Sequence, residues 1–203
     1  MKEREMQEKP LNEKESLELI TRMINNTQQK LERGAGAPML IWGYATIITT
    51  ITVLVALALT SDYRYNYLWF MIPAIGVTCM LLRKKQPKGV RTYIDKVIGY
   101  IWLVFGVTGF TLSMVSIFSG MWYFPILFII IIIMGMGSVL TGLIIEFKAM
   151  VVGGVVGMVI SLLHYSFSDY EMKTITFILA FIAMFIIPGH ILNYRAKKAC
   201  LKN

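Results

Sequence analysis

Six long apolar segments alternate with shorter polar connections along this chain. The clearest runs from Pro125 to Ile145 without one charged residue, and a helix needs about 20 apolar residues to cross the hydrocarbon core of a bilayer. A soluble domain of 203 residues has no interior that could bury six such helices. The pattern therefore predicts an all-α, polytopic membrane protein with six transmembrane helices, at 38–60, 67–82, 97–118, 123–145, 149–167 and 174–192.

The segment before the first span has the pattern of an amphipathic helix at residues 12–33, which Gly34 to Pro38 are predicted to end. Its apolar positions recur in steps of three and four and form a face of Leu17, Ile20, Ile24 and Leu31. Acidic and basic residues balance here, whereas a helix that lies on anionic lipid is rich in Lys and Arg. We expect this face to bind a protein partner or a second copy, or to pack against the membrane domain, and both interpretations stay open. The chain then divides into a cytoplasmic segment (1–37), a membrane domain (38–194) and a basic tail (195–203).

The charges give the orientation. Of the 20 Lys and Arg residues, only Arg64 and Lys173 fall in the connections that follow odd-numbered spans. Basic residues are retained on the cytoplasmic side, so both termini are predicted to be cytoplasmic. Arg83, Lys84 and Lys85 follow the second span, where topology accounts for them, and a contact with anionic lipid headgroups is compatible with this position. The net charge of +8 therefore does not indicate a nucleic-acid partner.

Glycines near the same end of the odd spans suggest an internal repeat. Gly43, Gly99 and Gly153 recur about every 55 residues, a spacing that fits three helical hairpins inserted in parallel. Glycine is common in this chain, so the repeat remains a hypothesis.

Two sets of residues are candidate sites. His190 and Asn193 follow Pro188 and Gly189, which are predicted to kink or break the last span, and lie at a similar depth to Glu146. These three polar residues form either a simple interfacial hydrogen bond or a gating or ligand site. The second set is predicted to pack helices closely, since its small residues are four positions apart: Gly153 with Gly157, and Ser138 with Gly142.

Aromatic residues cluster near the ends of the predicted spans. This distribution is typical of the belts that anchor membrane proteins at both interfaces, and it indicates a ligand cage only weakly. The residues concerned are Tyr63, Tyr65, Tyr67, Trp69, Trp122 and Tyr123 at one end, and Trp42, Tyr93 and Tyr194 at the other.

The six predicted spans contain no Asp, Glu, Lys or Arg. Such residues mark proton relays, ion sites and voltage sensors, so these functions are disfavoured. The sequence shows no catalytic, cofactor-binding or metal-binding motif, and its two cysteines suggest no disulfide or metal site. We therefore expect a non-enzymatic sensor, regulatory subunit or assembly partner without a cofactor. The alternative is a small-molecule permease or channel subunit whose path is lined by Ser and Thr.

Four stretches carry a resemblance to a family. They are 25–32 in the amino-terminal helix, 40–44 in the first span, 83–89 in the basic loop and 187–194 in the last span. With them the chain resembles small six-span bacterial inner-membrane proteins. The resemblance implies a bacterial origin and this topology, and it implies no activity.

Overall fold

The computed structural model describes residues 12–82, 93–118, 124–167 and 169–200. Within these ranges the chain folds into helices, which are α1 (Glu13–Thr60), η1 (Tyr63–Phe70), α2 (Met71–Leu82), α3 (Tyr93–Phe118), α4 (Ile126–Ile144), α5 (Lys148–Ser166), α6 (Tyr170–Phe181), η2 (Ile182–Ile186) and α7 (Ile187–Cys200). Two of these elements depart from α-helical geometry: η1 is a 3-10 helix and η2 is a π turn.

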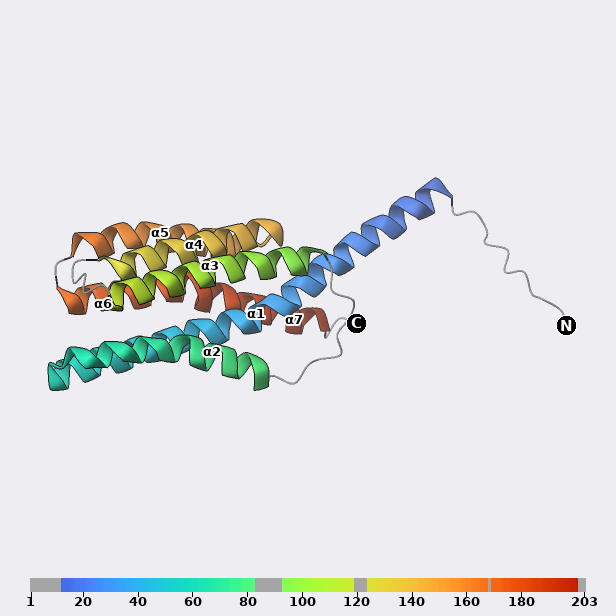
Figure 1. Ribbon diagram of the computed structural model, residues 1–203. Coiled ribbons are helices and arrows are strands. Elements are labelled where there is room, and N and C mark those ends of the chain that lie inside the picture. The colour runs from blue at the N-terminus through green and yellow to red at the C-terminus, as the bar shows by residue number, and fades with distance from the viewer. Residues whose placement is uncertain (1–11, 83–92, 119–123, 168, 201–203) are drawn as a thin grey trace.

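Six helical segments are long and apolar enough to cross a membrane, which confirms the predicted multi-pass class. They are Gly36–Thr60, Arg64–Leu82, Tyr93–Phe118, Ile126–Ile144, Lys148–Ser166 and Tyr170–Lys198. The last of them extends beyond the predicted 174–192 at both ends, because apolar residues mark only the hydrocarbon-crossing part of a helix. Figure 1 shows the six segments side by side, with both termini at one end of the bundle. We call this the terminal end, and the opposite end, which holds Thr60 and the start of η1, the distal end.

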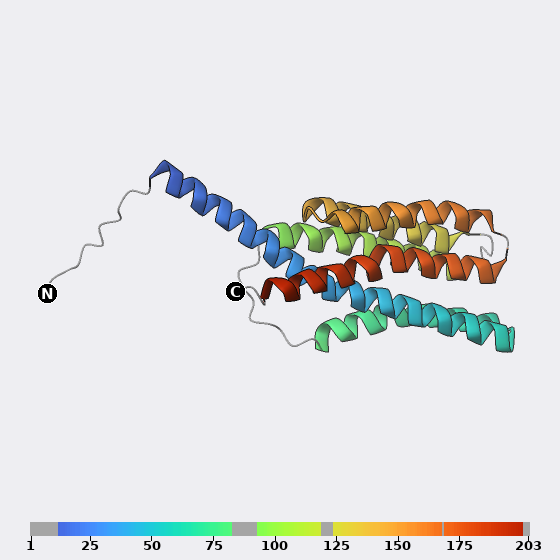
Figure 2. The same cartoon turned by 180° about the vertical axis from the view of Figure 1, so that it is seen from behind.

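The helices form an open arc. Around this arc α2 packs against α1, α1 against α6 and α7, α6 against α4, and α4 against α3, while α5 packs behind against α4 and α6. Figure 2 shows α5, α6, α7 and α1 covering the back of the bundle. The edges of the arc are α2 and α3, and only 6% of the most apolar window in each of these spans is buried, compared with 50% in the last span. The two least buried spans therefore flank an opening on the front of the bundle.

The stretch Gly34–Pro38 does not end the first helix, so this prediction is wrong: α1 runs through it without interruption, with the proline inside. Proline removes one helical hydrogen bond, but membrane helices tolerate it where neighbouring helices support the backbone. Here the neighbour is α7. A Cβ on Gly36 would lie 2.6 Å from Asn193 Oδ1, and a Cβ on Gly189 would lie 2.9 Å from the Leu40 side chain. The glycines allow two helices to approach closely.

The last span also continues through its proline, after the π turn η2. Pro188 has no N–H, so the carbonyl four residues earlier, that of Met184, loses its usual helical donor. The N–H of Ile187 donates instead to the carbonyl of Ile182, five residues back. The hydroxyl of Ser138 on α4 lies 3.4 Å from the Met184 carbonyl oxygen. The predicted break is therefore wrong: the helix continues through a π turn, which, like proline, is a common site of a helix kink.

The small residues predicted to pack helices lie between α4, α5 and the last span. A Cβ on Gly142 would lie 2.8 Å from a backbone nitrogen of α5. On Gly153 a Cβ would meet the carbonyl oxygen of Ala183, and on Gly157 it would meet the side chain of Met184. Backbones in membranes associate through such close contacts, because apolarity alone does not drive one helix against another in lipid.

Candidate functional site

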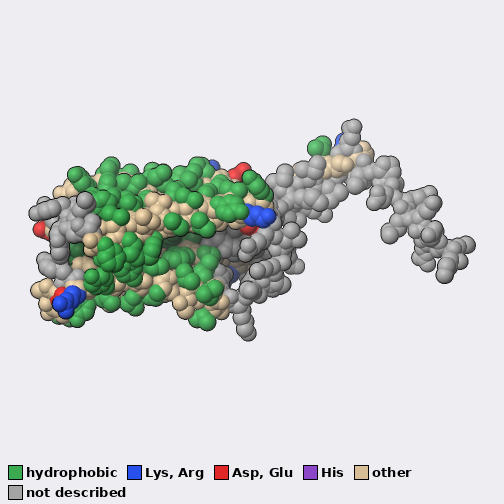
Figure 3. Space-filling model, in the orientation of Figure 1, with side chains coloured by type: hydrophobic (Ala, Val, Ile, Leu, Met, Phe, Trp, Pro, Cys, Tyr) green, Lys and Arg blue, Asp and Glu red, His purple; other side chains and the backbone are tan. Residues whose placement is uncertain are grey.

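The opening between α2 and α3 leads into a groove of about 1580 Å³. It extends from Pro38 and Asp95 near the terminal end to Glu171 and Lys173 at the distal end. On α1 the lining runs from Pro38 to Ala58, which is about 30 Å of helix and therefore close to the thickness of a hydrocarbon core. Figure 3 shows this face of the bundle hollowed along part of its length. The groove is thus about as long as a hydrocarbon core is thick, and it opens sideways between α2 and α3.

Aromatic rings line the floor of the groove. Phe177, Phe181 and Phe185 follow one another at intervals of four residues, which places them on one face of the last span. Their centroids lie 4.7 and 5.4 Å apart, and all three side chains are buried. Trp69 from η1 lies 5.6 Å from Phe177, and Trp102 from α3 lies 5.6 Å from Phe185, both edge to face. We call these five residues the aromatic floor.

The polar residues in the middle of the groove are already hydrogen-bonded. Thr46, Ser113 and Thr141 line it, and each hydroxyl donates to the carbonyl four residues earlier in its own helix, at 2.9, 2.8 and 2.7 Å. A hydroxyl has a single proton to donate. The middle of the groove therefore offers aromatic surface and hydroxyl acceptors, and these three side chains have no donor left for a solute.

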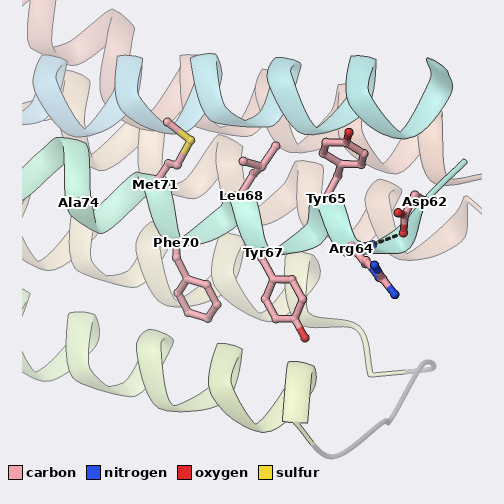
Figure 4. Close-up of a pocket in the computed structure, with 8 residues that line it drawn as sticks. All are labelled: Asp62, Arg64, Tyr65, Tyr67, Leu68, Phe70, Met71 and Ala74. Carbon is pink, nitrogen blue, oxygen red and sulfur yellow. Dashed lines mark hydrogen bonds between the residues drawn. The ribbon is translucent and has the colours of Figure 1, made fainter. Parts of the chain in front are cut away.

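At the distal end, η1 forms the α2 side of the groove. Because a 3-10 helix has three residues per turn, residues three apart share a face. Figure 4 shows Tyr67 and Phe70 pointing toward α3, while Leu68 and Met71 point toward α1. The Phe70 ring lies 6.3 Å from the Phe110 ring of α3. The two edges of the arc therefore touch across the groove at this level.

Charged side chains gather around the same distal end. Asp62 caps η1 by accepting a hydrogen bond from the backbone N–H of Arg64, at 2.9 Å. The Arg64 side chain is exposed and lines the groove, as do Glu171 and the half-buried Lys173 from the first turn of α6. The only two basic residues of the distal connections therefore both reach the groove.

His164 on α5 adds a polar group at this end. Its Nδ1 lies 3.0 Å from the hydroxyl oxygen of Thr176, and that hydroxyl can donate to the carbonyl of Met172 or Lys173, at 3.0 and 2.9 Å. With its proton used there, the hydroxyl oxygen accepts from an Nδ1–H of the imidazole. His164 lines the groove, although the residue is only 3% exposed.

The residues of the predicted polar site, His190, Glu146 and Asn193, come from two elements, α7 and the turn after α4. The Nε2 of His190 lies 2.8 Å from the hydroxyl of Tyr44, and Asn193 lies beside Gly36, so both residues face α1. Glu146 belongs to the turn between α4 and α5, where its φ is 55°.

That turn has a recognisable form. The N–H of Phe147 donates to the carbonyl of Gly142 at 2.8 Å. This six-to-one bond, with a left-handed residue just before the donor, is the usual Schellman ending of a helix. The backbone position of Glu146 is thus accounted for by helix termination.

The predicted partner-binding face belongs to the part of α1 that extends beyond the bundle. Leu17 is 65% exposed. The side chains of Ile20, Ile24 and Leu31 lie outside the described ones, as do the basic residues Arg83, Lys84 and Lys85.

Sequence reasoning missed the groove. It assigned Trp42, Tyr67 and Trp69 to interfacial belts, whereas all three line the groove. Their positions along the helices gave only their depth in the membrane. A detectable signal was present in the last span, where three phenylalanines recur at intervals of four residues.

In the described part of the chain, no three His, Cys, Asp or Glu residues lie close enough together to hold a metal ion. No known protein family, curated protein or solved structure matches the chain. The fold and the groove define a multi-pass membrane protein with six apolar helices and a lateral opening.

Proposed function

We propose that this protein is a non-enzymatic sensor or regulatory subunit of a bacterial inner membrane. It binds a hydrophobic molecule from the bilayer in the lateral groove, and the amino-terminal part of α1 transmits its occupancy to a protein partner. Topology in this proposal follows the charges: both termini are cytoplasmic, since Arg64 and Lys173 are the only basic residues on the other side.

The observation that carries the proposal is the continuity of α1. This helix lines the groove with Trp42 and Thr46 and continues without interruption to Glu13, well beyond the bundle (Figure 1). A helix is stiff over this length. A shift of α1 at the groove therefore displaces its amino-terminal part, which bears the exposed Leu17.

Contacts between α1 and the last span support the same coupling. A Cβ on Gly43 would lie 3.0 Å from the Phe185 side chain, and Phe185 belongs to the aromatic floor. Tyr44 of α1 bonds to His190 of α7 at 2.8 Å. A ligand that moves the floor thus acts on residues in direct contact with α1.

The alternative of a permease for polar solutes has less support. Such a path needs donors and acceptors that replace water, and the Thr46, Ser113 and Thr141 hydroxyls donate within their own helices. The groove also opens toward α2 and α3, where lipid has access. The three-hairpin repeat stays part of the proposal, supported by direct contact of α1 with α2, α3 with α4, and α5 with α6.

The test uses two double variants of the full-length protein. Ile20→Asp with Ile24→Asp places two acidic residues on the heptad face, and Asn26→Asp with Gln29→Asp places the same charges on the opposite side of the heptad. We expect the first variant to lose the co-purifying partner and the second to retain it, with equal amounts of both proteins in the membrane. Equal recovery of a partner with both variants would contradict the proposal.

A further inference from the structure

We infer that the groove binds a glycerophospholipid, with its acyl chains on the aromatic floor and its phosphate at Arg64 and Lys173. This inference deepens the proposed function, on which it rests, by naming the ligand of the groove. It also assigns a role to the two basic residues that the charge pattern leaves at the distal end.

The size of the groove favours lipid chains. Its 1580 Å³ exceeds the range of about 300–1,000 Å³ that is usual for small-molecule sites. In addition, the contact between Phe70 and Phe110 spans the groove. Flexible chains can lie beneath this contact, whereas a helix from a partner or a second copy would have to separate the two rings.

The distribution of polarity along the groove matches an amphipathic ligand. Between its ends the groove presents the half-buried rings of Trp69 and Trp102, which lie against the buried Phe177 and Phe185, and the charged lining residues that the structure describes lie near the two ends. Near the terminal end, the charged residue that lines the groove among those the structure describes is the acidic Asp95. At the distal end Arg64 and Lys173 supply two positive charges. The anionic group of the ligand therefore lies at the distal end.

Another polar group at the distal end specifies the headgroup further. Glu171, which lines the groove beside Arg64 and Lys173, is an acceptor. A headgroup that combines a phosphate with an N–H or O–H donor satisfies both the basic residues and the acceptor at this end. Phosphatidylethanolamine and phosphatidylglycerol have such headgroups. Phosphatidylcholine carries the same phosphate but has no such donor, so it should bind more weakly.

The tryptophans that line the groove provide the measurement. Trp42, Trp69 and Trp102 all lie along it, and bromine on an acyl chain quenches a nearby indole. Purified full-length protein in detergent is titrated with brominated phosphatidylethanolamine, phosphatidylcholine and diacylglycerol. We expect saturable quenching with the first, weaker binding with the second, and the weakest with diacylglycerol, which has the same chains and no phosphate.

Variants then test the two basic residues. Arg64→Gln with Lys173→Gln should weaken phosphatidylethanolamine binding about tenfold, the sum of two charge contacts that solvent can reach. The change does not oppose the proposed topology, because it removes positive charge from the non-cytoplasmic side. The matched control is Lys197→Gln with Lys198→Gln, which removes two exposed charges at the terminal end and should leave binding unchanged. Thermal unfolding of each variant checks that the fold is retained.

Three outcomes would overturn the inference. They are the absence of saturable quenching, equal binding of diacylglycerol and phosphatidylethanolamine, and unchanged binding by the Arg64 and Lys173 variant. A dimer that excludes lipid in native mass spectrometry would likewise overturn it and assign the groove to a second copy. All these measurements use the protein without its partner. The inference and the proposed function can therefore fail separately. The Ile20 and Ile24 variant can lose the partner while lipid binding stays intact, and lipid binding can be lost while the partner is retained.

Discussion

The hydroxyl oxygen of Ser138 on α4 lies 3.4 Å from the carbonyl oxygen of Met184 in η2 and 3.2 Å from that of Met150 on α5. One buried side chain thus links three helices at the point where Pro188 removes a backbone donor. Met184 immediately precedes Phe185, so this link also stabilises the backbone that carries the aromatic floor.

Ser138→Ala should destabilise the protein. Interhelical hydrogen bonds in membrane proteins contribute about 0.6 kcal/mol on average and up to about 1.7 kcal/mol, and this substitution removes a buried one. Ser113→Ala is the control, since its hydroxyl donates only to the carbonyl of Gly109 in the same helix, and its effect should be near zero. Reversible unfolding in mixed micelles gives the free energy of unfolding of both variants. A loss as large for Ser113→Ala would contradict the role of the link.

Gly153→Ala should be strongly destabilising because the new Cβ would meet a backbone carbonyl, that of Ala183, which cannot rotate away. We expect a loss of about 1–3 kcal/mol, as for overpacked interiors. Gly106→Ala in α3 is the counterpart, since its Cβ would have no atom within 4 Å. There alanine should raise the free energy of unfolding by about 0.5–1 kcal/mol, the difference between alanine and glycine in a helix. The midpoint of unfolding should therefore be higher for Gly106→Ala than for Gly153→Ala, and the measured order of the two midpoints tests this prediction.

Glu146→Gly should stabilise the turn between α4 and α5. The residue has a φ of 55°, a left-handed conformation that costs roughly 1 kcal/mol for a residue with a Cβ and nothing for glycine. Glu146→Ala removes the same carboxylate and keeps the strain, so it should show no such gain. If the carboxylate belonged to a polar site with His190, both variants would lose function equally, which an assay of partner recovery would reveal.

Phe70 and Phe110 should show coupled energetics. A double-mutant cycle with Phe70→Ala and Phe110→Ala is expected to give an interaction energy of about 0.5–1.5 kcal/mol, the range for aromatic pairs. A second cycle that combines Phe70→Ala with Tyr165→Ala should give a value near zero. Tyr165 contacts Phe128 at 5.4 Å on another part of the bundle. Additive effects in the first cycle would show that the edges of the arc do not touch in solution.

The apolar pattern predicted the number and approximate limits of the spans because crossing lipid is a local requirement of each segment. At Gly34–Pro38 the local sequence alone did not predict where the helix ends. In water such residues end a helix, but α7 packs against Gly36 and the helix continues. The same applies at Pro188, where Ser138, far away in the sequence, brings a hydroxyl within 3.4 Å of the carbonyl that lost its helical donor.

By itself the sequence determined that six apolar segments exist, how long each is, and how unevenly the basic residues are distributed between their connections. Only the tertiary structure decided that α2 and α3 flank an opening, that Trp69 and Trp102 line a groove, and that Arg64 and Lys173 lie at the same end of it. The physical reason is that lipid tails are as apolar as a neighbouring helix. Hydrophobicity therefore marks the depth of a residue in the membrane and leaves the direction in which its side chain points to the packing of the helices.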